Sequence, residues 1–329
     1  MRKIRIAING YGNLGKSAEI AARQFPDMAL AAILTRRNPR SIQPATAGLP
    51  VYHLDQAASL TGMIDVMILC SGSMKDLPEQ GPAMARLFHT VDGYDTHALI
   101  PEYFAAMDQA GRSAGKLNVI AAGWDPGLLS LQRLLSRAIL PAGKDETFWG
   151  RGVSQGHSDA IRRIRGVVDA RQYTIPREDA VEAVREGEDR ELSTADKHER
   201  ECYVVLEEGA DAQAVAAAIK AMPHYFADYH TTVHFVSLAE LKQNHAGLPH
   251  QGLMMRNGRT GRDQQHRQLY SVSLQLDSNP DFTAHVLLAC ARAAFRMAGE
   301  GQQGARTMLD IPPAYLSSLS SAELLSSIL

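Results

Sequence analysis

The sequence predicts an α/β fold in which an open, doubly wound parallel sheet is followed by a second α+β domain. A glycine-rich turn directly follows a short apolar run near the N-terminus, and further short apolar runs alternate with helix-like segments. After residue 123 the pattern changes to longer polar loops and alternating runs. The length of 329 residues suits two domains, because single cores stop growing at about 250–300 residues.

The first domain is expected to contain a strand at residues 4–8, a helix at 16–25 and a second strand at 28–34. This order is a βαβ unit with a right-handed crossover, and Pro26 ends its helix. Further strands are predicted at 66–70, 89–92 and 118–122, with helices at 81–87 and 103–114. We therefore expect residues 1–124 to form a Rossmann-type dinucleotide-binding domain.

The second domain is expected to span residues 125–282. Its predicted parts are a helix at 128–140, a glycine-rich binding loop at 148–159, a charged helix or loop on the surface at 185–200, and a helix at 212–222. Alternating runs at 202–207, 231–236 and 269–275 predict one antiparallel sheet with a solvated face. An amphipathic helix at 283–297 begins a C-terminal segment, 283–329, that should join the first domain.

Composition and charge argue against several classes of binding partner and of cellular location. The net charge of −2, with mixed signs, gives no footprint for a nucleic acid or an anionic membrane. Cys70, Cys202 and Cys290 are too scattered for a disulfide framework, and the histidines lack zinc-like spacing, so we assign no metal. No apolar run reaches the roughly 18 residues of a membrane helix, and the N-terminus has no room for a signal-peptide core. We expect a cytoplasmic protein.

A phosphate-binding loop follows the first strand, with the sequence Gly10-Tyr11-Gly12-Asn13-Leu14-Gly15. In this Gly-x-Gly-x-x-Gly pattern the glycines allow a tight turn, a close approach to the pyrophosphate and close helix packing. The hexapeptide alone is weak evidence, but here it lies between a strand and a helix in a βαβ unit. The alternative is a purely structural turn.

The second strand ends in Thr35-Arg36-Arg37, where an NAD-binding protein usually has an acidic residue for the ribose 2′-hydroxyl. Guanidinium groups at this place pair well with a 2′-phosphate. The sequence therefore favours NADP over NAD. The alternative is that both arginines are merely solvated.

Two loops after later strands, at 92–95 and 123–127, carry aspartates. Ligands of open α/β sheets bind beyond the carboxyl ends of the strands, so Asp95 and Asp125 are candidates for holding an ammonium near the nicotinamide. Aspartates in glycine-containing loops are also common turn formers, which is the alternative.

From end to end the chain resembles the meso-diaminopimelate D-dehydrogenase family. The matching segments are GYGNLGKS at Gly10, TRR at Thr35, CSGS at Cys70, GYDTH at Gly93, AAGWDPG at Ala121, TFWGRGVSQGHSDA at Thr147, QYTIP at Gln172, HERECYV at His198, GLPHQG at Gly247 and LDSNPDFTA at Leu276. The resemblance implies NADP-dependent, reversible oxidative deamination of the D-centre of meso-2,6-diaminopimelate to L-2-amino-6-oxopimelate, ammonia and NADPH. This reaction belongs to lysine and diaminopimelate metabolism.

The same resemblance implies roles for individual residues. Asp95 and Asp125 would be catalytic and contact the reacting amine, with Asp95 as the first choice of proton acceptor. The substrate would further contact Trp149, Gln155, Gly156, Thr174, Arg200, His250 and Asn279, the last four at the distal end. The cofactor would contact Gly10, Tyr11, Gly12, Asn13, Leu14, Gly15, Thr35, Arg36, Arg37, Cys70, Ser71, Gly72, Ser73, Gly93, Tyr94, Ala122, Gly123, Trp124 and Pro126. The family also implies a homodimer, with residues 125–282 as the substrate-binding and dimerisation domain.

Three positions depart from the family pattern. Arg151 stands where proline is expected, Gln251 where glycine is expected, and Gly93 where threonine is expected. Because these three positions adjoin the expected pocket, activity on simpler D-amino acids or 2-keto acids stays open.

Without the family, His250 would be assigned to a loop and Arg200 to the surface.

Other readings of the two-domain pattern are a dihydrodipicolinate reductase, an aspartate-semialdehyde dehydrogenase, and a redox-sensing regulator that binds NADP without turnover. A semialdehyde dehydrogenase needs a reactive thiolate, and none of the three cysteines is well placed for one. A cyclic-imine reductase does not need two carboxylates directed at a primary amine.

Overall fold

The computed structural model describes residues 2–188 and 190–329 and divides into two compact units. Unit 1 contains residues 1–132 and 280–329, and unit 2 contains residues 133–279. Unit 2 is thus inserted into the sequence of unit 1. Two helices carry the chain across the boundaries: α4 (Leu128–Ile139) leaves unit 1, and α10 (Asn279–Gly299) returns to it.

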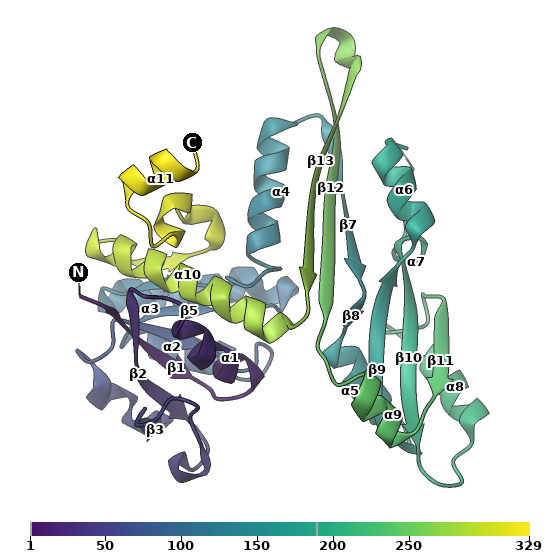
Figure 1. The fold of residues 1–329 in the computed structure, drawn as a ribbon, viewed down its shortest axis with the longest axis horizontal. Coiled ribbons are helices and arrows are strands. Elements are labelled where there is room, and N and C mark those ends of the chain that lie inside the picture. Colours follow the sequence, from purple (N-terminus) through teal and green to yellow (C-terminus); the bar gives the residue numbers. More distant parts are fainter. Residues whose placement is uncertain (1, 189) are drawn as a thin grey trace. The chain divides into compact units, whose positions relative to one another are not determined.

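Unit 1 is built on a parallel seven-stranded sheet with the order β14-β6-β5-β4-β1-β2-β3 (Figure 1). Its strands are β1 (Ile4–Asn9), β2 (Met28–Thr35), β3 (Val51–His53), β4 (Val66–Leu69), β5 (His89–Asp92), β6 (Leu117–Val119) and β14 (Gly304–Arg306). The order reverses between β1 and β4, which is the switch point where doubly wound sheets bind their ligands. The predicted fold class is confirmed.

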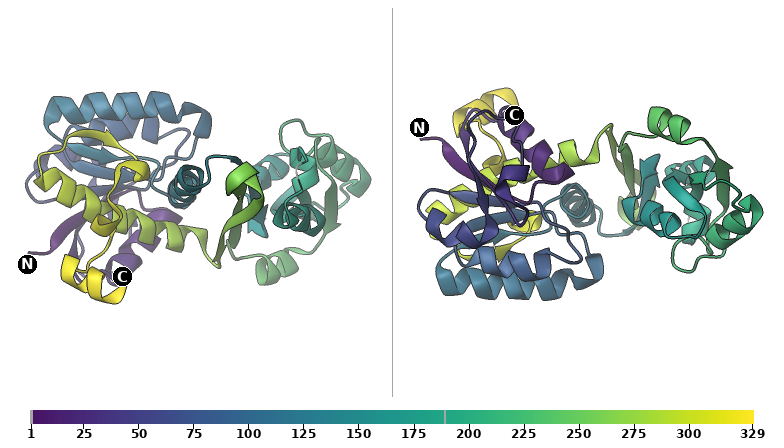
Figure 2. Two further views of the ribbon diagram at one scale, coloured as in Figure 1. Left: turned by 90° about the horizontal axis from the view of Figure 1, so that it is seen from above. Right: turned by 90° about the horizontal axis from the view of Figure 1, so that it is seen from below.

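Both faces of this sheet are buried, which explains why its strands are apolar runs without alternation. On one face Ile6 and Ile8 pack in a cluster with α1 (Asn13–Ala22) and α10. On the other face Ala7 joins a cluster with α2 (Leu77–Ala85) and α3 (Ile100–Ala114). The two views of Figure 2 show α3 and α10 on opposite sides of the sheet.

The C-terminal segment, residues 280–329, belongs to unit 1. The Arg292 side chain of α10 is 3% exposed, and its Nε and Nη2 donate to the Asp27 carboxylate at 2.5 and 2.7 Å. Its Nη1 donates to the carbonyl of Leu316 at 2.6 Å. One guanidinium therefore ties the start of β2, α10 and the chain leading to α11 (Ser321–Ser327) together.

Unit 2 contains two sheets. The first has the order β11-β10-β9-β8, with β8 (Gly152–Val153), β9 (Val167–Pro176), β10 (His198–Leu206) and β11 (Thr231–Phe235). The second has the order β13-β12-β7, with β7 (Gly143–Gly150), β12 (His250–Thr260) and β13 (His266–Leu276). The helices are α5 (Gln155–Arg162), α6 (Glu178–Glu186), α7 (Thr194–Lys197), α8 (Ala212–Lys220) and α9 (Leu238–Asn244).

The expectation of one antiparallel sheet in the second domain was wrong. The runs at 202–207 and 231–236 lie in one sheet and pair in parallel, whereas the run at 269–275 belongs to the other sheet. A parallel pair needs a crossover, and here α8 supplies it. Alternation showed one face of each strand but carried no information about strand direction or partner.

Two segment assignments in this domain also need correction. Residues 148–159 do not form one loop, because Ser154 caps α5 through its hydroxyl and a helix follows despite Gly156. Residues 185–200 are not wholly a solvated surface, because β10 begins at His198 and the side chains of His198 and Arg200 are buried. The charged composition of residues 185–200 did not indicate a strand, although alternate side chains at the start of β10 are buried.

Candidate functional site

The glycine-rich loop of unit 1 has the backbone geometry of a phosphate cradle. Gly10 has a φ of +97°, and a Cβ at Gly15 would lie 2.0 Å from the Gly10 carbonyl oxygen. Neither position accepts a side chain. A Cβ at Gly12 would meet nothing within 4 Å, and Gly12 is the N-cap of α1, where unpaired amides favour an anion. The residues present therefore fit a dinucleotide pyrophosphate.

The sequence-predicted arginines lie at the end of β2, and both are exposed. Arg37 Nη2 donates to the carbonyl of Tyr11 at 2.6 Å, which ties it to the glycine-rich loop. Arg36 Nη2 lies 2.8 Å from a carboxylate oxygen of Asp76, which follows β4. Two guanidinium groups at the end of β2 have the charge and donors that suit a phosphate.

The loop at residues 70–73 borders the glycine-rich loop. A Cβ at Gly10 would lie 3.1 Å from the Cys70 carbonyl carbon, and the Cys70 amide donates to Asn9 O at 2.7 Å. The Ser71 hydroxyl donates to Gln80, and the Ser73 hydroxyl accepts from the Asp95 amide at 3.2 Å. This last contact links the loop after β4 to the backbone of Asp95, the residue with the predicted catalytic carboxylate.

The two aspartate loops of unit 1 are joined by Asp92, whose ordering role the sequence did not reveal. Its carboxylate is 0% exposed and accepts from the amides of Tyr94 and Ala121 and from the Tyr103 hydroxyl at 3.0, 3.3 and 2.8 Å. Burial raises the pKa of Asp92 to about 6. Asp95 itself is exposed and Asp125 is half-buried. Asp92 thus orders the backbone that carries both candidates.

In unit 2, Arg200 and Thr174 occupy directly opposed positions of β10 and β9. The Arg200 guanidinium is 8% exposed and donates through Nη1 to the Thr174 hydroxyl. Burial lowers the pKa of Arg200. Gln155 and Gly156 begin α5, which packs on β9. The structure therefore brings four of the predicted substrate residues to two strands and the helix that covers them.

The other three predicted residues lie at the ends of the second sheet. Trp149 is on β7, and its amide donates to His198 Nε2 at 2.7 Å, an acceptor that requires a neutral imidazole; burial lowers the pKa of His198 to about 4. His250 begins β12, and the Asn279 amide donates to the carbonyl of Leu248, two residues before it, at 3.1 Å. His250 thus lies on a strand end and packs against Gly152.

The structure shows what surrounds two of the positions that depart from the family pattern, Arg151 and Gly93. Arg151 Nη2 pairs with Glu201 at 3.0 Å and its guanidinium lies over the Tyr173 ring, so it ties the segment after Trp149 to β9 and β10. A Cβ at Gly93 would lie 3.9 Å from Thr283 and Leu287, which is ordinary contact. That position has room for a side chain.

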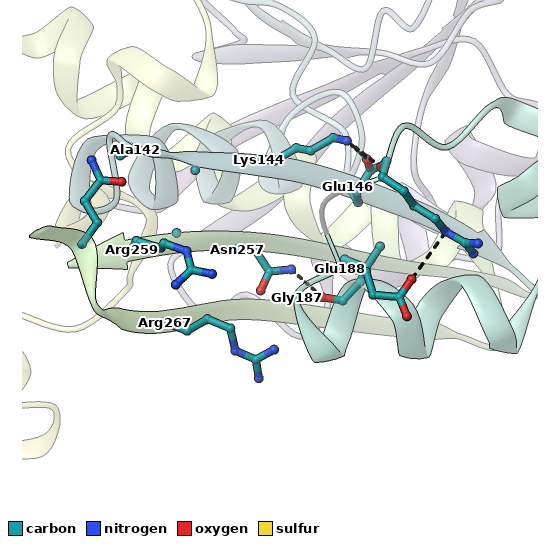
Figure 3. A pocket seen from close by; sticks show the side chains of 13 residues that line it. Ala142, Lys144, Glu146, Gly187, Glu188, Asn257, Arg259 and Arg267 are labelled. Carbon is teal, nitrogen blue, oxygen red and sulfur yellow. Dashed lines mark hydrogen bonds and ion pairs between the residues drawn. The ribbon is translucent and has the colours of Figure 1, made fainter.

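A pocket of about 380 Å³ in unit 2 lies apart from these residues. Arg259 and Arg267, on directly opposed positions of β12 and β13, border it together with Lys144 and Glu188 (Figure 3). None of the sequence-predicted site residues lines it. It therefore adds nothing to the candidate site.

The described residues contain no group of His, Cys, Asp or Glu side chains placed to hold a metal ion, and none of their helices is long and apolar enough to cross a membrane. The three cysteines are free, and burial raises the pKa of each thiol to about 12. A thiol with such a pKa is not an effective nucleophile at neutral pH, which argues against the semialdehyde dehydrogenase reading.

The doubly wound sheet, its glycine-rich loop and the inserted second unit define a two-domain protein of the dinucleotide-binding oxidoreductase class. Residues 123–278 match the family model described as diaminopimelic acid dehydrogenase C-terminal domain. The meso-diaminopimelate D-dehydrogenase of Acetivibrio thermocellus is 59% identical over 100% of this chain and 98% of its own length. The chain belongs to the meso-diaminopimelate D-dehydrogenase family.

Solved structures agree with this membership. The diaminopimelate dehydrogenase of C. glutamicum in complex with diaminopimelate superposes with a TM-score of 0.91 at 41% identity, covering 100% of both chains. An engineered D-amino acid dehydrogenase bound to NADP+ superposes with a TM-score of 0.85 at 39% identity, covering 99% of this chain and 100% of the other.

Proposed function

We propose that this protein is an NADP-dependent dehydrogenase that oxidises the D-centre of meso-2,6-diaminopimelate to L-2-amino-6-oxopimelate, releasing ammonia and NADPH. The observation that supports this substrate is the burial of the Arg200 guanidinium, for which no carboxylate partner is described. A buried cation of this kind is costly unless an anion pairs with it. The distal carboxylate of diaminopimelate is such an anion, and a relative was solved with diaminopimelate bound.

The cofactor assignment is supported by the cradle at Gly10–Gly15 and by Arg36 and Arg37, and a relative was solved with NADP+ bound. The proposed cofactor contacts are those predicted from the sequence, which include the loops at 70–73, 93–94 and 122–126. NADP+ supplies the hydride acceptor. The protein's part is to hold the reacting carbon in near-attack geometry.

In the proposed reaction the C–H bond at the D-centre breaks with its electron pair, and the amine nitrogen gives up a proton to Asp95, directly or through a water. Water then adds to the resulting imine carbon, and ammonia leaves. Asp95 and Asp125 follow neighbouring strands of one sheet edge, which supports their placement beside the amine. Thr174, Arg200, His250 and Asn279 would bind the distal end, with Trp149, Gln155 and Gly156 along the substrate.

The test is to mix the protein with NADP+ and meso-diaminopimelate at alkaline pH and to follow NADPH absorbance. Turnover is expected with the meso isomer and NADP+, and little with the L,L isomer or with NAD+. Asp95→Asn should lower kcat by about 10²–10⁴ while NADPH binding stays unchanged. Tight NADPH binding without turnover of any amine would instead favour a sensor.

We further propose that the protein is a cytoplasmic homodimer. Free thiols suit a reducing compartment. β13 is an edge strand of 11 residues whose outer edge has no neighbouring strand in the described sheet, and Leu269 on it is 39% exposed. A long exposed edge of this kind is a template for pairing with another chain.

A further inference from the structure

Arg200 has an incomplete set of partners. Thr174 accepts from its Nη1, but its Nε has no hydrogen-bond partner and is shielded from solvent. The groups that raise its pKa in the described part of the chain are Tyr229, whose side chain also hydrogen-bonds to it, and Cys202, neither of which is a carboxylate. The guanidinium therefore keeps both its charge and a donor for a ligand.

The ring of Tyr229 lies against this guanidinium. The Arg200 Cζ is 3.9 Å from the ring centroid, the shortest of the arginine–ring contacts described for this chain, whose others span 5.2–6.0 Å. An aromatic face attracts a cation without neutralising it. The ring also covers one face of the guanidinium, so a carboxylate must approach along its edge, where the N–H donors point.

The backbone holds the two side chains together. The Tyr229 amide donates to Phe226 O at 3.0 Å, and Phe226 is 0% exposed, which anchors the segment before β11. The Arg200 amide donates to His230 O at 2.9 Å, next to Tyr229. Arg200 and Thr231 are paired residues of β10 and β11. The guanidinium is therefore carried by β10, and the ring is carried by the segment that leads into the neighbouring, hydrogen-bonded strand β11.

We propose that Tyr229 is a positioning residue that sets substrate specificity, because its ring fixes the plane of the Arg200 guanidinium, which binds the carboxylate remote from the reacting amine. This inference rests on the proposed function, in which Arg200 anchors that carboxylate. A neutral ring is suited to the task because a carboxylate at this position would compete with the substrate for Arg200.

The test compares Tyr229→Leu, Tyr229→Phe and Tyr225→Leu in steady-state assays with meso-diaminopimelate. Tyr229→Leu should raise the KM for meso-diaminopimelate about 10-fold, with kcat and the KM for NADP+ within about twofold. Tyr229→Phe keeps the ring face and removes only the hydroxyl that hydrogen-bonds to Arg200, so it should stay within about threefold of wild type. Tyr225, in the same segment, has ring contacts with His157 and Phe226 rather than Arg200, so its variant controls for loss of a tyrosine ring.

A double-mutant cycle with Arg200→Met separates this role from a merely structural one. The effect of Tyr229→Leu on kcat/KM should vanish in the Arg200→Met background. An equal effect in both backgrounds, or an unchanged KM in Tyr229→Leu, would overturn the inference. Tyr229→Met gives the same comparison if the leucine variant does not fold. If the wild type does not oxidise meso-diaminopimelate, the proposed function fails; if it does and Tyr229→Leu behaves like wild type, only this inference fails.

Discussion

At the scale of single residues, we propose that the charges of Arg36 and Arg37 decide which dinucleotide the protein prefers. Arg36 is exposed and already paired with Asp76, whereas Arg37 is tied to the glycine-rich loop through Tyr11. The two arginines are thus held by different supports at the end of β2, where the ribose 2′-phosphate is proposed to bind. Each would add one charge-assisted contact to a 2′-phosphate, and neither has an equivalent partner on NAD.

Replacing both arginines, in Arg36→Ala/Arg37→Ala, should raise the KM for NADP+ by about 100-fold, from two charge-assisted contacts of about 1.5 kcal/mol each. The KM for NAD+ should change by less than about threefold. Steady-state kinetics with each cofactor at saturating substrate measures both values. An equal loss with NADP+ and NAD+ would show that the arginines support the loop rather than read the phosphate.

Asp92 gives a second prediction, in the pH dependence of stability. Its pKa in the folded protein is about 6, above the ordinary value of 3.8, so the folded state holds this proton more tightly than the unfolded state. Its contribution to stability is therefore present below about pH 4 and is lost as the pH rises to about 6. Asp92→Asn keeps the two backbone bonds and does not ionise.

Urea unfolding of wild type and Asp92→Asn at several pH values tests this. The stability of the variant relative to wild type should increase between pH 4 and 6 by about 2–3 kcal/mol and then level off. The difference between the two proteins removes the other titrating groups. A difference that does not change with pH would show that Asp92 stays ionised in the folded state.

At the scale of elements, α10 is held by more than its apolar face. The Arg292 guanidinium is almost fully buried against Asp27, and this contact holds the pKa of Asp27 below its usual range. Because the folded pKa is lowered, this stabilisation is present above the ordinary pKa of 3.8 and is lost as the pH falls below it. The ion pair fixes where the helix docks on the N-terminal strands.

Arg292→Met should lower the free energy of unfolding by about 2–3 kcal/mol at neutral pH, because it leaves the partly buried Asp27 without its cation. Arg296→Met, on the same helix, should cost less than about 1 kcal/mol, since the described hydrogen bonds of Arg296 go to two backbone carbonyls, one exposed and one partly buried, and not to a carboxylate. Denaturant unfolding at pH 7 compares them. Equal losses would mean that helix packing, not the ion pair, holds α10.

The elements also show what the sequence can and cannot predict. The βαβ unit, its glycine loop and the buried parallel strands were correctly predicted, because they rest on local turn chemistry and apolar runs. Strand direction and sheet membership in unit 2 were not, since both depend on pairing between distant segments. The resemblance named Arg200, but only the fold shows that its charge is buried and that Tyr229 covers it.

At the scale of the whole molecule, the proposed dimer makes a simple prediction. Sedimentation equilibrium should give twice the 35.9 kDa of one chain. Leu269→Lys on β13 should shift the protein toward monomer, because it places a desolvated charge in the interface. Leu325→Lys, on the exposed face of α11, should leave the mass unchanged. A Leu269→Lys protein that stays dimeric would place the interface elsewhere.

The insertion of unit 2 into unit 1 has a consequence for synthesis on the ribosome. The edge strand β14 at residues 304–306 is made only after the whole of unit 2 has been translated. It is therefore the last strand to join the parallel sheet of unit 1. Unit 2 is continuous from 133 to 279 and has its own apolar clusters. It can therefore complete its fold while the sheet of unit 1 still lacks its last strand.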